Sequence, residues 1–321
     1  MKAEAFGVDA SSYTPHDLHR LERVWPETNC YVDLWIELLH ALRLDPTAVM
    51  AFTVAMDFEV DQWTFFKPSL DDIRSLYGIE VQELAIWRPL RIQIAEQIAR
   101  QRVPLVEVDS FYLPDTAGVS YQIEHTKTTV GAQAIDLGAR RLGYFHGAGY
   151  FELAGADFDA IFTVGETAMA PYTEIAKLDR LVSRSTTELR AVAVQQLNGY
   201  LGRIPSSNPV ATYRARYMSD LEWLAGEDMP VFYKYAFATL RQCGACAEVA
   251  SSFLDWLSDN GAPRSNASTN FYEIATAAKA MQFKLARMMA TRKPADVAPM
   301  LDRMESCWTN AMAELTAAYG T

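Results

Sequence analysis

Long hydrophobic runs are missing from this sequence of 321 residues. No run reaches the roughly 18 apolar residues that a membrane-spanning helix needs, and the N-terminal segment has no hydrophobic signal core. Dense blocks of lysine and arginine are also missing, and the net charge is −11. Because nucleic-acid phosphates and anionic membranes both bind a cationic face, we expect neither as the main partner. The missing signal core predicts a cytoplasmic protein.

Cysteine is scarce, and the four cysteines are unevenly spaced, which does not indicate a disulfide framework. Cys243 and Cys246 have the spacing of a zinc or redox half-site, but no second pair and no histidine cluster accompany them, so helix packing is favoured. The motifs GxGxxG, P-loop, HExxH and GxSxG do not occur. Nucleotide-driven, zincin and serine-hydrolase chemistry therefore lack support, and no bound cofactor is expected.

The first half of the chain alternates helical and β-type patterns. Apolar residues at helical spacing predict a helix over 31–43 that Asp45-Pro46 stops, and a serine cap with a glycine stop predicts another over 69–78. Further elements are expected as strands over 49–56, 63–66 and 79–84 and a helix over 89–101.

From residue 104 the pattern is mostly β. Short runs predict strands over 104–109, 122–130, 132–137, 141–146 and 159–165, with Gly131 and Gly138 at tight reversals. After residue 166 the periodicity is helical throughout. We therefore predict an α+β fold with two domains. Residues 1–165 would form a papain-like catalytic domain, with a helix packed on an antiparallel sheet, and residues 166–321 an all-helical domain.

Cys30 is the first candidate for chemistry. Pro26 and Thr28 or Asn29 are helix-start signals that place Cys30 in the first turn, where exposed amides and the helix dipole favour a thiolate. Those amides are suited to hold an oxyanion, with Asn29 as a second donor. The alternative is a buried cysteine that fills a gap in the core.

His125 and Asp136 complete a candidate triad with Cys30. His125 opens one expected strand and Asp136 ends the next, so a hairpin would bring the imidazole and the carboxylate side by side. Cysteine at a helix start, with a histidine and an acid on paired strands, is the arrangement of a papain-like thiol enzyme. The alternatives are a structural histidine and a turn aspartate before Gly138.

Four further residues are candidates for substrate binding. Asp109, followed by Tyr112, ends a strand where loops often build pockets, although it would equally start a turn. Lys127 shares a strand face with His125 and would contact an anionic group, unless it is simply solvated. His146, in the aromatic and glycine-rich YFHGAGYF, is the main rival for the base.

Four segments carry a resemblance to a known family: NCYVDLWIELLHAL, VEVDSFYLPDT, HTKTTVGAQAID and LGYFHGAGYFEL. With these segments the chain resembles the bacterial family called domain of unknown function 1839, over most of its length. The N-terminal half more distantly resembles the N-terminal domain of butirosin-type acyltransferases. Those have a papain-like fold and move an acyl group from a carrier-protein thioester to an amine.

This second resemblance implies Cys30 as nucleophile, His125 as base and Asp136 as orienting acid, with Asp109 and Tyr112 at the rim. The glutamine that papain-type peptidases place before the cysteine is missing, which disfavours a peptidase. The resemblance to the first family further implies an association with carrier-protein amino-acid activation systems, which favours acyl transfer.

The expected function is thus cysteine-dependent acyl or aminoacyl transfer. An acyl or aminoacyl carrier protein would present the thioester on phosphopantetheine, and a small amine or hydroxyl compound would accept the acyl group. Thioester exchange is nearly isoenergetic, so it depends mainly on positioning and oxyanion stabilisation. The alternatives are a cysteine peptidase or amidase with water as acceptor, and a non-catalytic binding protein on a papain-like fold.

Overall fold

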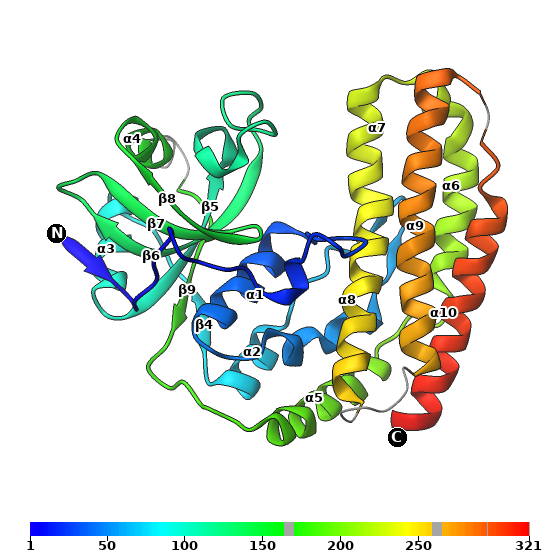
Figure 1. Cartoon of the computed structure of the whole chain (residues 1–321), viewed down its shortest axis with the longest axis horizontal. Coiled ribbons are helices and arrows are strands. Elements are labelled where there is room, and N and C mark those ends of the chain that lie inside the picture. Colours follow the sequence, from blue (N-terminus) through cyan, green and yellow to red (C-terminus); the bar gives the residue numbers. More distant parts are fainter. Residues whose placement is uncertain (164–169, 259–264, 294, 321) are drawn as a thin grey trace. The chain divides into compact units, whose positions relative to one another are not determined.

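The computed structural model describes residues 1–163, 170–258, 265–293 and 295–320 (Figure 1). The chain forms two compact units whose segments alternate along the sequence. Unit 1 comprises Met1–Arg20, Asn29–Pro46 and Ser69–Arg184, and unit 2 comprises Leu21–Thr28, Thr47–Pro68 and Ser185–Thr321. The last boundary follows Arg184, later in the chain than the expected boundary at residue 165.

Unit 1 is built on an antiparallel sheet, as the predicted α+β class requires. Among the described residues its main strands lie in the spatial order β4 (Glu80–Glu83), β9 (Thr173–Lys177), β5 (Arg102–Asp109), β6 (Lys127–Asp136), β7 (Arg141–His146) and β8 (Gly149–Ala154). On one side of β6, β5 pairs with its first half and the short β1 (Lys2–Glu4) pairs with its last three residues. β6 is therefore covered along its length on that side by two separate segments.

Four α-helices of unit 1 surround this sheet in the described chain. They are α1 (Cys30–Ala41), which packs on β6, β7 and β8; α2 (Leu70–Tyr77), beside β4; α3 (Leu90–Ile98), against β5, β6 and β1; and α4 (Ala156–Thr163), beside β8. Single 3₁₀ turns cover Asp17–His19, Ser110–Tyr112 and Pro114–Thr116. The sequence signals for α2 are confirmed: the Ser69 hydroxyl accepts the amide of Asp71, and Gly78 ends the helix with a φ of 72°.

Gly131 allows α1 to approach the sheet closely. A Cβ at this position would lie 3.3 Å from Cδ1 of Leu34, so the glycine makes room for the helix and forms no turn. The two strands expected over 122–130 and 132–137 are consequently one strand, β6. At the start of α1, the Tyr31 hydroxyl donates to Glu174 of β9 over 2.8 Å.

Two other expected strands are helices. The apolar run 49–56 belongs to a 3₁₀ helix, Pro46–Ala55, whose Val49 and Met50 are fully buried. A short apolar run fits a buried strand and a buried helix equally well, and here the strand interpretation is wrong. The run 159–165 falls largely in α4, while Val164 and Gly165 lie outside the described residues.

Unit 2 is dominated by helices, as predicted. Its described α-helices are α5 (Thr186–Leu201), α6 (Pro209–Gly226), α7 (Met229–Ala236), α8 (Gln242–Leu257), α9 (Asn266–Thr291) and α10 (Ala298–Tyr319). α9 packs against α8 and α10, and α10 also packs against α6 and α5. A π-helical turn, Phe237–Arg241, joins α7 and α8 into the continuous rod seen in Figure 1.

The N-terminal segments of unit 2 pack against this bundle. β2 (Phe58–Glu59) and β3 (Gln62–Trp63) form a small hairpin, and the rings of Phe58 and Trp63 contact the ring of Tyr213 on α6. In the parts of the chain that the structure describes, no helix is both long and apolar enough to cross a membrane.

Candidate histidine–aspartate site

The first turn of α1 is capped from within the chain. The side-chain oxygen of Asn29 accepts the amides of Tyr31 and Val32, over 3.2 and 3.0 Å, and Asn29 itself is only 2% exposed. Cys30 follows as the first helical residue, partly exposed and not in a disulfide. The cap therefore occupies the Tyr31 and Val32 amides, and the oxyanion site expected from Asn29 and Cys30 stays a prediction.

His125 is paired with Asp109, not with Asp136. The loop 110–126 folds back so that Nδ1 of His125 lies 2.6 Å from Oδ2 of Asp109, at the end of β5. The other oxygen of Asp109 accepts the amide of Phe111, and the Phe111 ring stacks on the imidazole at 4.2 Å with an angle of 12° between the planes. The imidazole is thus held from one edge and one face, while 65% of the side chain is exposed.

This arrangement fixes the tautomer of a neutral imidazole. A carboxylate accepts only from a protonated nitrogen, so Asp109 selects the form with hydrogen on Nδ1 and a lone pair on Nε2. No hydrogen bond to Nε2 of His125 occurs within the described part of the chain. His125 therefore presents an outward-facing base that a carboxylate orients.

Asp136 lies at the far end of β6 from His125. The strand runs extended from Lys127, two residues after His125, to Asp136, a length of about 30 Å. Its carboxylate accepts the amides of Gly138 and Ala139 in the β6–β7 turn, over 2.9 and 3.0 Å. The expected pairing of Asp136 with His125 is wrong, because residues 127–136 form one strand and not a hairpin, with His125 just before its start and Asp136 at its end. Asp136 is the turn aspartate of the alternative interpretation.

Cys30 opens α1 next to a residue whose side chain reaches the sheet. Tyr31, its neighbour, bonds to Glu174, which pairs with Leu105 of β5. Asp109, the partner of His125, is four residues further along β5, or about 13 Å. Within the described residues, no hydrogen bond, ion pair or ring contact joins Cys30 to His125.

His146 is a buried structural residue. Its Nδ1 lies 2.6 Å from a carboxylate oxygen of Asp115 and its Nε2 lies 2.8 Å from the hydroxyl of Thr128. Tyr144 donates its hydroxyl to the other oxygen of Asp115. Both ring nitrogens of His146 therefore have partners within the protein, whereas Nε2 of His125 has none among the described residues.

The remaining expected binding residues flank His125. Lys127 forms an ion pair with Glu107 of β5 at 2.7 Å, and its side chain is 67% exposed. The ring of Tyr112 meets the His125 ring edge-on at 6.2 Å. Asp109 and Tyr112 therefore contact the imidazole, and Lys127, which lies opposite Asp109 in the strand register, is at the same end of the sheet.

A second ionic cluster is buried beneath α1 and was missed by the sequence analysis. The His19 ring lies between two carboxylates of the helix, with Nε2 3.2 Å from Asp33 and Nδ1 bonded to Glu37. Glu37 also accepts the hydroxyl of Tyr13 at 2.5 Å and the backbone amide of His16 at 3.1 Å. The spacings of three between Tyr13, His16 and His19 and of four between Asp33 and Glu37 were the available signal.

The two carboxylates keep His19 charged. Burial alone lowers the pKa of an imidazole, but the hydrogen bonds and charges of Asp33 and Glu37 outweigh it and raise the pKa of His19 to about 9. Since both ring nitrogens are engaged and the side chain is inaccessible, this cluster stabilises the fold and is closed to a ligand.

The fold and site define a protein with a sheet-based unit that carries an exposed histidine–aspartate pair, and a separate helical unit. Within the described residues, no group of three His, Cys, Asp or Glu side chains is placed to hold a metal ion. The chain belongs to the DUF1839 family: the model of the DUF1839 N-terminal domain matches residues 14–178, and that of the C-terminal domain matches residues 186–317. Among curated proteins, none matches the chain.

Proposed function

We propose that unit 1 catalyses acyl transfer from a thioester, with His125 as the general base and Asp109 as the residue that positions it. The observation that carries the proposal is the 2.6 Å bond between Nδ1 of His125 and Asp109, together with the exposed imidazole. The donor would be an acyl or aminoacyl group on the phosphopantetheine of a carrier protein, and the acceptor an amine or a hydroxyl. The thioester donor is proposed because the sequence of the N-terminal half resembles that of butirosin-type acyltransferases.

The chemistry needs one base that changes role. Nε2 of His125 takes a proton from the acceptor as its nitrogen or oxygen attacks the thioester carbonyl. The tetrahedral intermediate then expels the thiolate, which receives the proton from the imidazolium. Asp109 stabilises the imidazolium, and stacking on Phe111 keeps Nε2 aimed outward. An oriented base of this kind accounts for a factor of about 10² to 10⁴ in rate.

Direct transfer differs from the covalent route in the role of Cys30. In the covalent route the Cys30 thiol would carry the acyl group before the acceptor takes it, as the sequence predicts. The position of Cys30 in the first turn of α1 favours that route, whereas the lack of a contact between Cys30 and His125 within the described residues favours direct transfer. Hydrolysis, with water as acceptor, would use the same base.

The test uses acetyl and aminoacyl thioesters of pantetheine with hydroxylamine as acceptor, and products are quantified by mass spectrometry. His125→Ala should lower the rate by at least about 100-fold, and Asp109→Asn by about 10- to 100-fold, because the ring is no longer held in one tautomer. Asp159→Asn is the matched control, since this exposed carboxylate pairs with Arg140 on the surface and with no other side chain that the structure describes. It should leave the rate unchanged.

Intact-mass measurement separates the two routes. Direct transfer predicts no acyl adduct on the protein and full activity of Cys30→Ala. An adduct on Cys30 that is required for turnover would replace direct transfer by the covalent route. Full activity of His125→Ala would remove the proposal altogether.

A further inference from the structure

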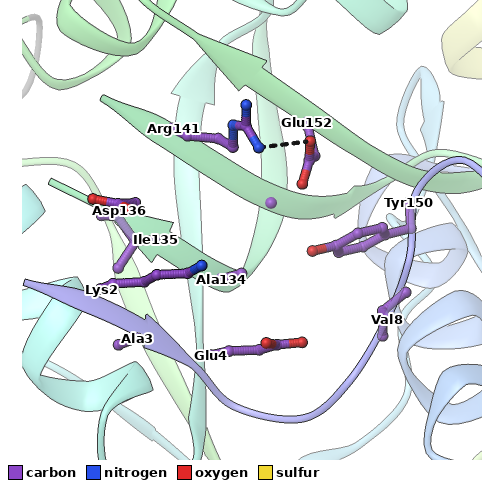
Figure 2. A pocket seen from close by; sticks show the side chains of 11 residues that line it. Lys2, Ala3, Glu4, Val8, Ala134, Ile135, Asp136, Arg141, Tyr150 and Glu152 are labelled. Carbon is purple, nitrogen blue, oxygen red and sulfur yellow. Dashed lines mark ion pairs between the residues drawn. The ribbon is translucent and has the colours of Figure 1, made fainter. Parts of the chain in front are cut away.

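A pocket of about 160 Å³ opens on the sheet of unit 1, at the end of β6 far from His125 (Figure 2). Engineered protein cavities of about 150 Å³ hold a benzene molecule, so the pocket has room for a ligand of similar size. Its floor consists of Ala134 on β6 and Gly143 on β7, which pair directly. Because these residues have little or no side chain, the space above them stays open.

Charged side chains surround this floor in two rows across the strands. In the outer row Lys2 and Arg141 flank Asp136, and in the next row Glu4 and Glu152 flank the floor. Side chains two residues apart on a strand point to the same face, so both rows face the pocket. The site therefore combines cations at its outer end with carboxylates further in.

Some of these charges are satisfied by the protein and others are not. The Asp136 carboxylate is held by the amides of the turn that follows. Arg141 and Glu152 approach to 3.9 Å, which is too long for a hydrogen bond and leaves guanidinium donors available. Lys2 and Glu4 both line the pocket and form no ion pair in the described part of the chain, and Glu4 accepts one long hydrogen bond, of 3.5 Å, from the side-chain amide of Gln133.

The inner end of the pocket is fixed by a hydrogen bond. Tyr150 donates its hydroxyl to the side-chain oxygen of Gln133 over 2.6 Å, and its ring closes the pocket beside Val8 (Figure 2). A Cβ on Gly143 would lie 2.1 Å from the Tyr150 hydroxyl, so only glycine permits this position of the ring. The pocket is thus formed before any ligand binds.

We propose that the pocket binds a small zwitterion, such as a free amino acid. Its carboxylate would lie toward Lys2 and Arg141, and its ammonium group toward Glu4. A ligand with a single charge would pair either with the cations or with the carboxylate of the pocket and leave the other without a partner. A zwitterion would make charge-assisted hydrogen bonds to both. The site is separate from the His125–Asp109 pair, because the length of β6 lies between them.

The experiment measures binding to the full chain by calorimetry and by ligand-observed NMR. The zwitterionic probes are glycine and β-alanine, and the single-charge probes are acetate and methylammonium. A zwitterion should bind at millimolar concentration, at least about tenfold more tightly than either single-charge probe. Arg141→Gln and Glu4→Gln should each weaken it by about tenfold or more. Arg140→Gln, which changes the preceding arginine that pairs with Asp159, is the matched control and should bind normally.

The binding site is also located in the wild-type protein, so that the result does not depend on variants that fail to fold. A bound probe should show NMR contacts to the ring protons of Tyr150 in the wild-type protein. The proposal is overturned if neither zwitterion binds, if acetate or methylammonium binds equally well, if a bound probe does not contact Tyr150, or if folded Arg141→Gln and Glu4→Gln keep full affinity.

Discussion

Raising the pH from about 7 to about 8.5 should weaken unit 1 through one buried side chain, His19. Its pKa is about 9 in the folded protein, compared with 6.5 for a histidine in water without charged neighbours, as in the unfolded chain. The folded state therefore binds the proton more tightly than the unfolded chain. The stability gained in this way is fully present below about pH 6.5 and is lost as the pH rises through about 9.

The structure sets the size of the effect. The difference between a pKa of 6.5 and one of about 9 corresponds to about 3 kcal/mol, at about 1.4 kcal/mol per pH unit. Between pH 7 and pH 8.5 the loss should be roughly 2 kcal/mol. Asp33 and Glu37 cause the effect, because both carboxylates contact the His19 ring in the protein interior.

The assay must report on unit 1 alone. The protein is equilibrated in increasing urea at each pH and then pulsed with D₂O at one fixed pH, and deuterium uptake is measured in peptides from α1. The urea midpoint for α1 should fall steadily across this pH range. A histidine NMR titration adds a direct measurement, since one of the five histidines should titrate near pH 9.

His19→Gln supplies the control. Glutamine has a similar polar reach without the titrating charge, so this variant should be less stable at neutral pH by about 3–5 kcal/mol, the usual cost of unpairing buried charges. Its α1 midpoint should change little between pH 7 and pH 8.5. If the wild-type protein and the variant show the same pH dependence, or if no histidine titrates above pH 8, the reasoning about this cluster fails.

Two further outcomes follow from packing. Gly244→Ala should lower the stability of unit 2 by about 1–3 kcal/mol in thermal unfolding, because a Cβ there would lie 2.5 Å from the buried Trp25 ring. Gly199→Ala is the control, since nothing lies within 4 Å of that position, and it should be neutral or slightly stabilising. Iodoacetamide should label Cys30 first and Cys243 only on unfolding, because burial raises the pKa of the Cys243 thiol; peptide mapping that finds equal labelling would contradict this.

Local signals in the sequence were reliable where a structure depends on neighbouring residues. Ser69 and Gly78 predict both ends of α2, because capping involves residues only a few positions apart. Gly131 misled the strand prediction because its role is set by Leu34, nearly a hundred residues earlier in the chain. A glycine required for close helix approach and a glycine required for a turn look the same in a sequence.

The candidate site shows the same limit. The sequence offered His125 and Asp109 as separate candidates, but it assigned the orienting role to Asp136. The pairing of His125 with Asp109 depends on the path of the loop 110–126, which spacing alone does not specify. Residue types therefore supplied the candidate side chains, and tertiary structure decided which of them meet.

The alternation of the two units along the chain has a consequence for synthesis. Leu21–Thr28 and Thr47–Pro68 leave the ribosome early, yet the helices that complete unit 2 belong to Ser185–Thr321. More than a hundred residues must be added in between, which takes on the order of 10 s at 5–20 residues per second. During that time aromatic residues such as Trp63 have no access to Tyr213. A protein fragment truncated before α5 would contain these aromatic residues without the helices that bury them, so such fragments should aggregate or require a chaperone.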